Sequence, residues 1–294
     1  MKEVFVRGKS LPEAYHMAIT ALHCEGEVLT SNDWNQRQKE VSMTFVAEEP
    51  LFEPMVSKLY IGGFHELQQY VMEIVEGILD FKIGDGWDYT YHDRMARFPI
   101  SRRREREADS LVLEATSDGD GQKGYDAYRG HEAQAGKEEQ APLDQIQFVI
   151  DELRRQPDSR RAVMSIRDNG VDPFGTDPAC LQHVQYFIRD GMLHCKVLLR
   201  SNDAPKASFM NAFAFVFLQK KIAGELGVNV GSYTHRANSY HAYERDFALL
   251  EQYAHAIESK GIEEITYEYE GFYRELMEER IPAIREMVEG LRNR

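Results

Sequence analysis

Apolar and polar positions follow two different periods along this chain, so the sequence predicts both strands and helices. An apolar strand pattern opens residues 3–24 and continues into a helix that Ser10 caps, with Pro12 early in its first turn. Residues 40–46 alternate between apolar and polar, as a half-buried strand does. Residues 64–78 space their apolar side chains at helical intervals, which predicts an amphipathic helix.

The second half of the chain carries a denser series of such patterns. The predicted elements are a helix at 143–153, a strand at 161–166, two strands within 184–199, a helix at 211–226, a strand at 231–239, and helices at 243–260 and 275–291. Asp190 and Gly191 form the turn between the paired strands, and Pro282 interrupts the last helix. Because strands and helices do not alternate regularly, we expect an α+β fold with a mixed sheet. The helix at 211–226 is apolar on nearly all sides, which predicts a buried central helix.

Residues from about 101 to 140 break these patterns. A run of arginines and glutamates is followed by a stretch rich in glycine and aspartate, with few apolar side chains. We expect a charged surface insertion within a single domain that spans residues 1–294. The arginine cluster is better interpreted as a solvated charge run than as a nucleic-acid patch, because Glu105 and Glu107 interrupt it.

Composition narrows the class of protein. A hydrophobic content of 43% fits a globular protein, and the formal net charge of −14 argues against general binding to nucleic acid. Basic residues that converge on one pocket would still bind a small anion. No apolar run is long enough to span a membrane and no secretion signal opens the chain, so we expect a cytoplasmic protein. Three cysteines at unrelated spacings predict neither disulfides nor a metal site.

One cysteine, Cys180, stands within an ordered series of polar side chains. A thiol becomes a nucleophile when nearby positive charge stabilises its thiolate. Arginine also binds phosphate through paired hydrogen bonds of fixed geometry. Arg160, Arg161 and Arg200 would serve both purposes if they surround the same pocket as Cys180. The pattern therefore indicates covalent chemistry on a phosphorylated substrate.

The order of these groups resembles thymidylate synthase. The series runs Pro157–Arg161, Cys180, Arg200–Asp203, Asn211 and His241–Tyr243, and it is strongest from about residue 144 to residue 246. Weaker matches lie upstream at Glu66 and Tyr91. The residues that follow the cysteine are most similar to archaeal-type members. Five ordered motifs with matching gaps are far more specific than any one of them alone.

The resemblance implies a role for each matching residue. Cys180 would attack C6 of a pyrimidine nucleoside 5′-monophosphate, and C5 would then take a one-carbon unit from 5,10-methylenetetrahydrofolate or a methanopterin relative. Arg200 and Ser201 would bind the phosphate, together with Arg160 and Arg161 from the partner subunit of a homodimer. Asn211 would recognise the base, and His241 and Tyr243 would bind the ribose. Glu66 and Tyr91 would transfer protons, and Asp203 would contact the folate ring.

Departures from the common members of that family bear on the product. Leu181 follows the cysteine where they carry histidine, and the stretch before Tyr91 holds Trp87 in place of a tryptophan pair over the folate. The last residues also lack the small apolar tail that closes the common site. Hydride transfer requires that water be kept from the reacting carbon. We therefore expect hydroxymethylation of dUMP in preference to reductive methylation to dTMP.

Alternative interpretations stay open. The Asn211 amide matches uracil through a donor to O4 and an acceptor for N3–H, but a turned amide accommodates cytosine, so dCMP and CMP are alternative substrates. The chain is alternatively a nucleotide-binding protein without catalysis, although Cys180, Glu66 and Tyr91 together argue against that. Glu66 on its own fits a solvated helix position equally well. Cys195 lies in the middle of a strand and is expected in the core.

Overall fold

The computed structural model describes residues 1–31, 36–100, 141–175 and 177–293. The described residues within 1–98 and 144–293 form one compact unit, the larger of the two into which the chain divides. The predicted insertion at about 101–140 lies outside the described residues. The assignment of the whole chain to a single domain therefore stays a prediction.

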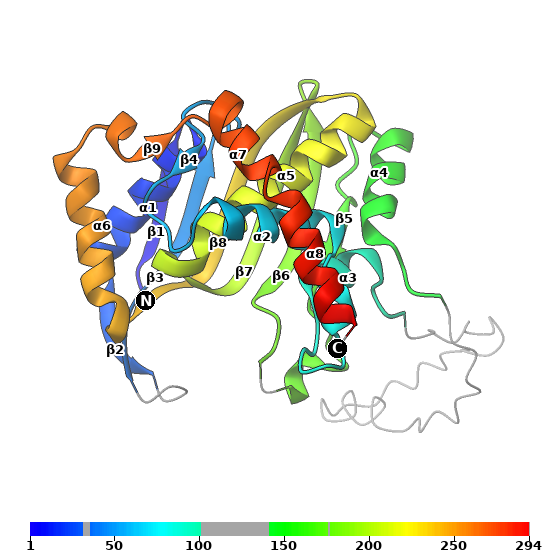
Figure 1. Ribbon diagram of the computed structural model, residues 1–294, viewed down its shortest axis with the longest axis horizontal. Coiled ribbons are helices and arrows are strands. Elements are labelled where there is room, and N and C mark those ends of the chain that lie inside the picture. The colour runs from blue at the N-terminus through cyan, green and yellow to red at the C-terminus, as the bar shows by residue number, and fades with distance from the viewer. Residues whose placement is uncertain (32–35, 101–140, 176, 294) are drawn as a thin grey trace, which may run out of the picture. The chain divides into compact units, whose positions relative to one another are not determined.

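A mixed sheet runs through the larger unit, and the α+β fold class is confirmed (Figure 1). In the described part of the chain its order is β1-β3-β8-β7-β6-β5, and β2 also pairs with β3. The pairs β1–β3 and β7–β8 are parallel, and the other pairs are antiparallel. The strands are β1 (Glu3–Gly8), β2 (Glu27–Ser31), β3 (Gln36–Ala47), β5 (Val163–Ser165), β6 (Leu181–Arg189), β7 (Met192–Asp203) and β8 (Asn229–Tyr243). A separate two-stranded sheet joins β4 (Val56–Ser57) and β9 (Thr266–Tyr267).

One face of the main sheet is buried and the other keeps contact with solvent. Along β7, Cys195 and Val197 are buried, whereas His194 is half-buried and Lys196 is exposed. This alternation follows from the pleat of a strand, which turns successive side chains to opposite faces. The helices α1 (Leu11–Glu25), α4 (Gln145–Arg155) and α5 (Phe209–Leu226) pack against the sheet. The expected core position of Cys195 is confirmed.

Residues close in sequence determine where the helices begin and end. Ser10 caps α1 through its hydroxyl, which accepts the Glu13 backbone N–H at 3.3 Å, and the Glu13 carboxylate completes the capping box. The central helix α5 is buried over most of its length, as predicted, and ends at Gly227. The remaining α-helices are α2 (Phe64–Glu76), α3 (Tyr91–Ala96), α6 (Phe247–Ser259), α7 (Arg274–Glu278) and α8 (Ile281–Arg292). None of the helices in the described ranges is long and apolar enough to cross a membrane.

One predicted boundary is wrong. A helix was expected from residue 243, but β8 continues to Tyr243 and α6 begins only at Phe247. Tyr240, His241 and Ala242 are all buried, so the two-residue alternation that marks a strand is lost at this end. Tertiary packing on both faces of the strand explains the difference.

Two glycines provide a matched test of packing at helix ends. Gly77 and Gly227 close α2 and α5 with the same left-handed φ of 67°. A Cβ atom at Gly227 would meet nothing within 4 Å, whereas one at Gly77 would overlap the side chains of His92 and Asp80. We expect Gly227→Ala to lower the free energy of unfolding by about 1 kcal/mol from backbone strain alone, and Gly77→Ala by roughly 1–3 kcal/mol more. Equilibrium urea unfolding measures both values, and equal losses would contradict the packing described.

Candidate active site

The ends of two parallel strands bring several predicted residues together. β7 and β8 pair with Ser201 opposite Ser239 and Asp203 opposite His241. Neighbouring parallel strands run in one direction, so these side chains gather at the same edge of the sheet. Arg200 precedes Ser201 on β7 and lies next to this group.

His241 has a hydrogen-bonding position that the protein leaves open. The residue is 4% exposed, and its Nδ1 lies 3.5 Å from the Ser201 Oγ and 3.3 Å from the Ser239 Oγ. Its buried Nε2 has no hydrogen-bond partner among the described residues. Burial lowers the pKa of the imidazole, so the ring is neutral at pH 7. The Tyr243 ring packs edge-on against it at 4.7 Å between centroids. This arrangement suits a hydroxyl group of a ligand.

Cys180 lies directly before β6, half-buried, and is tied to Arg200 through the backbone. The Cys180 carbonyl accepts the Arg200 backbone N–H at 2.7 Å. The guanidinium group of Arg200 turns toward the same segment, where Nε donates to the Ala179 carbonyl at 3.2 Å and Nη2 to the Pro178 carbonyl at 2.6 Å. The predicted nucleophile and its predicted cation therefore belong to one local structure.

The electrostatic surroundings of Cys180 oppose ionisation in the free protein. Burial raises the pKa of its thiol, the Arg200 cation lowers it, and the Asp177 carboxylate raises it again. The net shift is upward, so the thiol form predominates at neutral pH. In the part of the chain that the structure describes, Arg200 alone of the three predicted arginines acts on this thiol.

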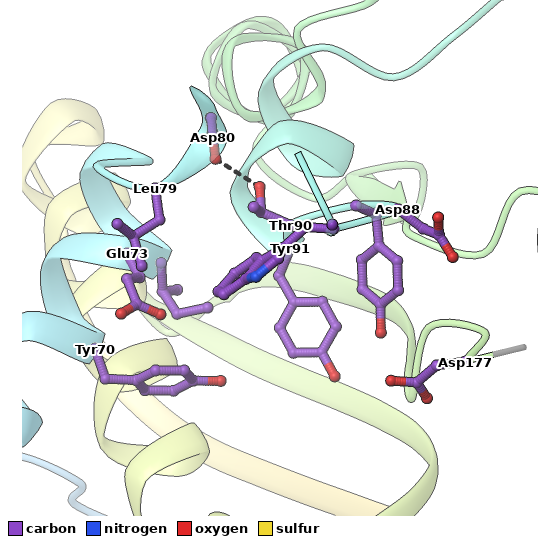
Figure 2. A pocket seen from close by; sticks show the side chains of 12 residues that line it. Tyr70, Glu73, Leu79, Asp80, Asp88, Thr90, Tyr91 and Asp177 are labelled. Carbon is purple, nitrogen blue, oxygen red and sulfur yellow. Dashed lines mark hydrogen bonds between the residues drawn. The ribbon is translucent and has the colours of Figure 1, made fainter. Parts of the chain in front are cut away.

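A cavity of about 480 Å³ lies between α2 and the segment before α3. Its wall includes Tyr70, Glu73, Asp80, Trp87, Tyr91 and Asp177. Figure 2 shows Tyr70 and Glu73 on one side, Asp177 on the other, and the Tyr91 ring between them. Cys180 acts electrostatically on Tyr70 and Tyr91, two of the lining side chains, but is not itself among the residues that line the cavity.

A hydrogen-bond network holds Tyr91 in the cavity wall. Thr90 Oγ1 donates to Asp80 Oδ1 at 2.5 Å, drawn as a dashed line in Figure 2, and His92 Nδ1 lies 2.7 Å from Asp80 Oδ2. Thr90 also caps α3 by accepting the Asp93 backbone N–H at 2.9 Å. Tyr91 is the first residue of that helix. Burial raises the pKa of Tyr91 well above its usual value, so its hydroxyl stays protonated.

Asn211 is fixed by a neighbour from another helix. It lies in the first turn of α5 and is 6% exposed. The Tyr70 hydroxyl, from α2, donates a hydrogen bond to its Oδ1. Burial raises the pKa of Tyr70, which keeps this hydroxyl protonated and able to donate.

Asp203 ends β7 with a carboxyl group whose pKa is raised toward neutral pH. Its Oδ1 accepts the Lys206 backbone N–H at 3.2 Å. Burial raises the pKa of Asp203 to about 6, and the Asp246 carboxylate adds to the rise. A carboxyl group with this pKa can donate or accept a hydrogen bond near neutral pH. Its contact with a folate ring stays a prediction.

The two carboxylates of α2 have different surroundings. Glu66, predicted for proton transfer, is exposed in the first turn, where its own backbone N–H and that of Gly63 lower its pKa. Glu73 lines the cavity, accepts the Gln69 Nε2 at 2.8 Å, and has a pKa raised by burial. The structure brings Glu73, and not Glu66, to the cavity.

Arg160 and Arg161 lie between α4 and β5, and both side chains are exposed. Their backbone is well fixed: the Arg160 carbonyl accepts Gln185 Nε2 at 3.0 Å, and the Arg161 N–H donates to Ser159 Oγ at 3.1 Å. Neither side chain lines the cavity. Their predicted role across a subunit interface stays a prediction.

The cavity wall combines aromatic rings with carboxylates. Trp87 is 43% exposed at this wall, and Glu73 and Asp80 lie in the same lining. Flat heteroaromatic rings stack on aromatic side chains, and carboxylates accept hydrogen bonds from ring N–H groups. The cavity is thus suited to a polar ring system. Within the described ranges, no three His, Cys, Asp or Glu side chains converge as metal ligands would.

Tyr70 and Glu73 were missed by sequence reasoning. They lie four and seven residues after Glu66, so a single helical face carries all three side chains. That periodicity was visible in the sequence. Which residues of that helical face line the cavity depends on how α2 packs against α5. The local sequence pattern does not determine this packing.

Known proteins that are similar to this chain carry the name of the family that the sequence motifs resemble. The profile of the thymidylate synthase family matches residues 79–263, more than half of the chain. A protein of Methanocaldococcus jannaschii named "Putative thymidylate synthase" is 27% identical over 258 residues, covering 84% of this chain and 95% of its own length. A protein of the same name from Methanosarcina acetivorans is 23% identical, covering 84% and 92%. A third, from Methanothermobacter thermautotrophicus, is 36% identical over 110 residues, covering 37% and 50%.

The opposing effects on Cys180 predict how its reactivity depends on pH. Because the Arg200 cation lowers the thiol pKa, Arg200→Gln should move the midpoint of Cys180 alkylation to higher pH. Iodoacetamide labelling across a pH series, read by peptide mass spectrometry, measures this midpoint. The exposed Cys24 is the internal control, and its midpoint should not move. An unchanged Cys180 midpoint in a variant with native circular dichroism would contradict the electrostatic coupling.

Proposed function

This chain belongs to the thymidylate synthase family, and from that premise we propose that it transfers a one-carbon unit to C5 of a pyrimidine nucleoside 5′-monophosphate, most specifically dUMP. The observation that carries the proposal is that Cys180 is hydrogen-bonded through its backbone to Arg200 and acts electrostatically on Tyr91, whose side chain lines the cavity. A thiol, a cation for phosphate and a protonated phenol are the groups that this chemistry requires.

The reaction follows from addition of the Cys180 sulfur to the ring. The thiolate forms a bond to C6, and the displaced electrons make C5 a carbon nucleophile. C5 bonds to the one-carbon unit of 5,10-methylenetetrahydrofolate, or of a methanopterin relative, and loses its proton. Departure of the carrier then leaves a methylene group on C5. Addition of water to that group and expulsion of Cys180 give the hydroxymethyl product and leave the carrier as tetrahydrofolate. Addition of hydride from tetrahydrofolate, which is thereby oxidised to dihydrofolate, gives the methyl product instead.

The remaining residues bind the nucleotide in this proposal. Arg200 and Ser201 hold the phosphate, with Arg160 and Arg161 supplied by a second subunit. The open Nε2 of His241, beside Tyr243, supports a hydrogen bond to the ribose hydroxyl. Asn211 reads the base, and Asp203 faces the pterin.

Hydroxymethylation is the product we favour, because the cavity wall is polar and its tryptophan is exposed. Trp87 is 43% exposed, and Glu73, Asp80 and Asp177 place carboxylates along the wall. A polar, partly open cavity keeps water near the methylene carbon, and hydride transfer competes poorly under that condition.

Product analysis separates the two reactions. We expect the pure protein, incubated with dUMP and 5,10-methylenetetrahydrofolate, to form 5-hydroxymethyl-dUMP and release tetrahydrofolate, as measured by mass spectrometry. Formation of dTMP with dihydrofolate would instead assign reductive methylation. Parallel incubations with dCMP and CMP identify the base.

Release of tritium from C5-tritiated dUMP tests whether the chain is a catalyst at all. The wild type should release tritium to water, and Cys180→Ala should lose at least about a thousandfold in rate, as removal of a covalent nucleophile does. Glu66→Gln and Glu73→Gln form a matched pair on one helix. The variant that falls by roughly a hundredfold identifies the carboxylate that transfers protons. A wild type without tritium release would support a nucleotide-binding protein without catalysis.

The partly open face of the sheet supports a homodimer. His183, Phe187 and Leu198 are half-buried there, so two such faces would cover apolar surface by packing together. Mixing two inactive variants tests whether the partner completes the site. Cys180→Ala combined with Arg161→Ala should recover about one quarter of wild-type sites, because each mixed dimer of a symmetric pair contains one intact site. No recovery after verified subunit exchange would place Arg161 outside the partner's site.

A further inference from the structure

The side-chain amide of Asn211 contacts Tyr70 on one side and is accessible to a ligand on the other. On one side lies the Tyr70 hydroxyl, which donates to Oδ1. On the other, the amide keeps some access to a ligand, since Asn211 is 6% exposed. An amide offers one acceptor oxygen and one donor nitrogen. The hydroxyl of Tyr70 therefore turns the oxygen toward itself and the nitrogen away.

Uracil and cytosine make opposite demands on such an amide. Uracil has a donor at N3 and an acceptor at O4, whereas cytosine has an acceptor at N3 and a donor at N4. The observed amide meets uracil directly, because the Oδ1 keeps a second lone pair for N3–H while Nδ2 donates to O4. Cytosine requires the amide to turn, which places the NH₂ group of Asn211 against the Tyr70 hydroxyl.

We propose that Tyr70 determines base specificity by holding the Asn211 amide in the orientation that accepts uracil. This inference rests on the proposed function, since it assumes that Asn211 reads a pyrimidine. Turning the amide leaves the proton of Tyr70 in need of another acceptor. In the structure the Tyr70 hydroxyl donates to Asn211 Oδ1, and Glu73 on the same helix accepts from Gln69 at 2.8 Å. Tyr70 is thus a positioning residue that acts through Asn211.

The two helices that carry these residues hold the contact in place. α2 packs directly against α5, and Tyr70 and Asn211 meet across that interface. Asn211 lies on a helix that is buried over most of its length, so its backbone has little freedom to move away. The orientation of the amide therefore depends on the hydroxyl of Tyr70 more than on local flexibility.

Substitution of Tyr70 by phenylalanine removes this hydroxyl and keeps the ring. We expect Tyr70→Phe to reduce the preference for dUMP over dCMP by about fivefold to tenfold, the effect of one hydrogen bond. Isothermal titration of both nucleotides gives the ratio of Kd values, and C5 tritium release gives the ratio of kcat/KM. Tyr89→Phe removes a hydroxyl from the same cavity and should leave the ratio unchanged.

A double-mutant cycle separates positioning from a general loss of packing. If Tyr70 acts through Asn211, then Tyr70→Phe should not alter the dUMP to dCMP ratio in an Asn211→Ala background. An unchanged ratio in the Tyr70→Phe single variant, or an equal change in both backgrounds, overturns the proposal. These outcomes differ from failure of the proposed function, in which the wild type binds neither nucleotide and releases no tritium.

Discussion

Parallel pairing of β7 with β8 is the constraint on which the rest of this structure depends. A buried hydrogen-bond chain reinforces it: His235 Nε2 lies 2.8 Å from the Asn202 Oδ1, and His235 Nδ1 lies 2.9 Å from the Tyr233 hydroxyl. Burial lowers the pKa of His235 to about 3, so the ring is neutral and satisfies one donor and one acceptor. Because both strands end at the same edge, residues far apart in sequence meet there.

Polar groups that a core would normally exclude are buried at that edge for a chemical purpose. Structural polar residues such as Asn202 find partners within the fold, whereas His241 keeps a buried nitrogen without one in the described residues. Leaving such an atom unpaired costs stability, typically about 1–3 kcal/mol. A ligand hydroxyl that pairs with it recovers that loss on binding. Other buried side chains, such as those of His16 and Gln219, also have an atom without a partner in the described part of the chain, so it is the position of His241 at the strand ends, beside Ser201, that favours a ligand.

Local rules predicted much of the fold, because they concern atoms close in sequence. The Ser10 cap, the stop at Gly227 and the core position of Cys195 follow from capping, backbone conformation and strand pleat. The motif series also grouped Cys180 with Arg200, and the structure joins the two by a backbone hydrogen bond. What it did not locate was Glu73, because the part of α2 that faces the cavity depends on packing between distant segments. Arg160 and Arg161 are exposed and outside the cavity lining, and the role predicted for them involves a second subunit.

The balance of charges near Cys180 is an independent argument for a contribution from a second subunit. A nucleotide phosphate carries close to two negative charges at neutral pH, and this chain has a net charge of −14. Near Cys180 the described cation is Arg200, whose guanidinium already donates to two backbone carbonyls, while Asp177 opposes it. Phosphate bound by Arg200 alone would weaken the cation that stabilises the thiolate. In the proposed function, exposed arginines from a neighbouring copy would supply additional positive charge without burying unpaired cations in the free chain.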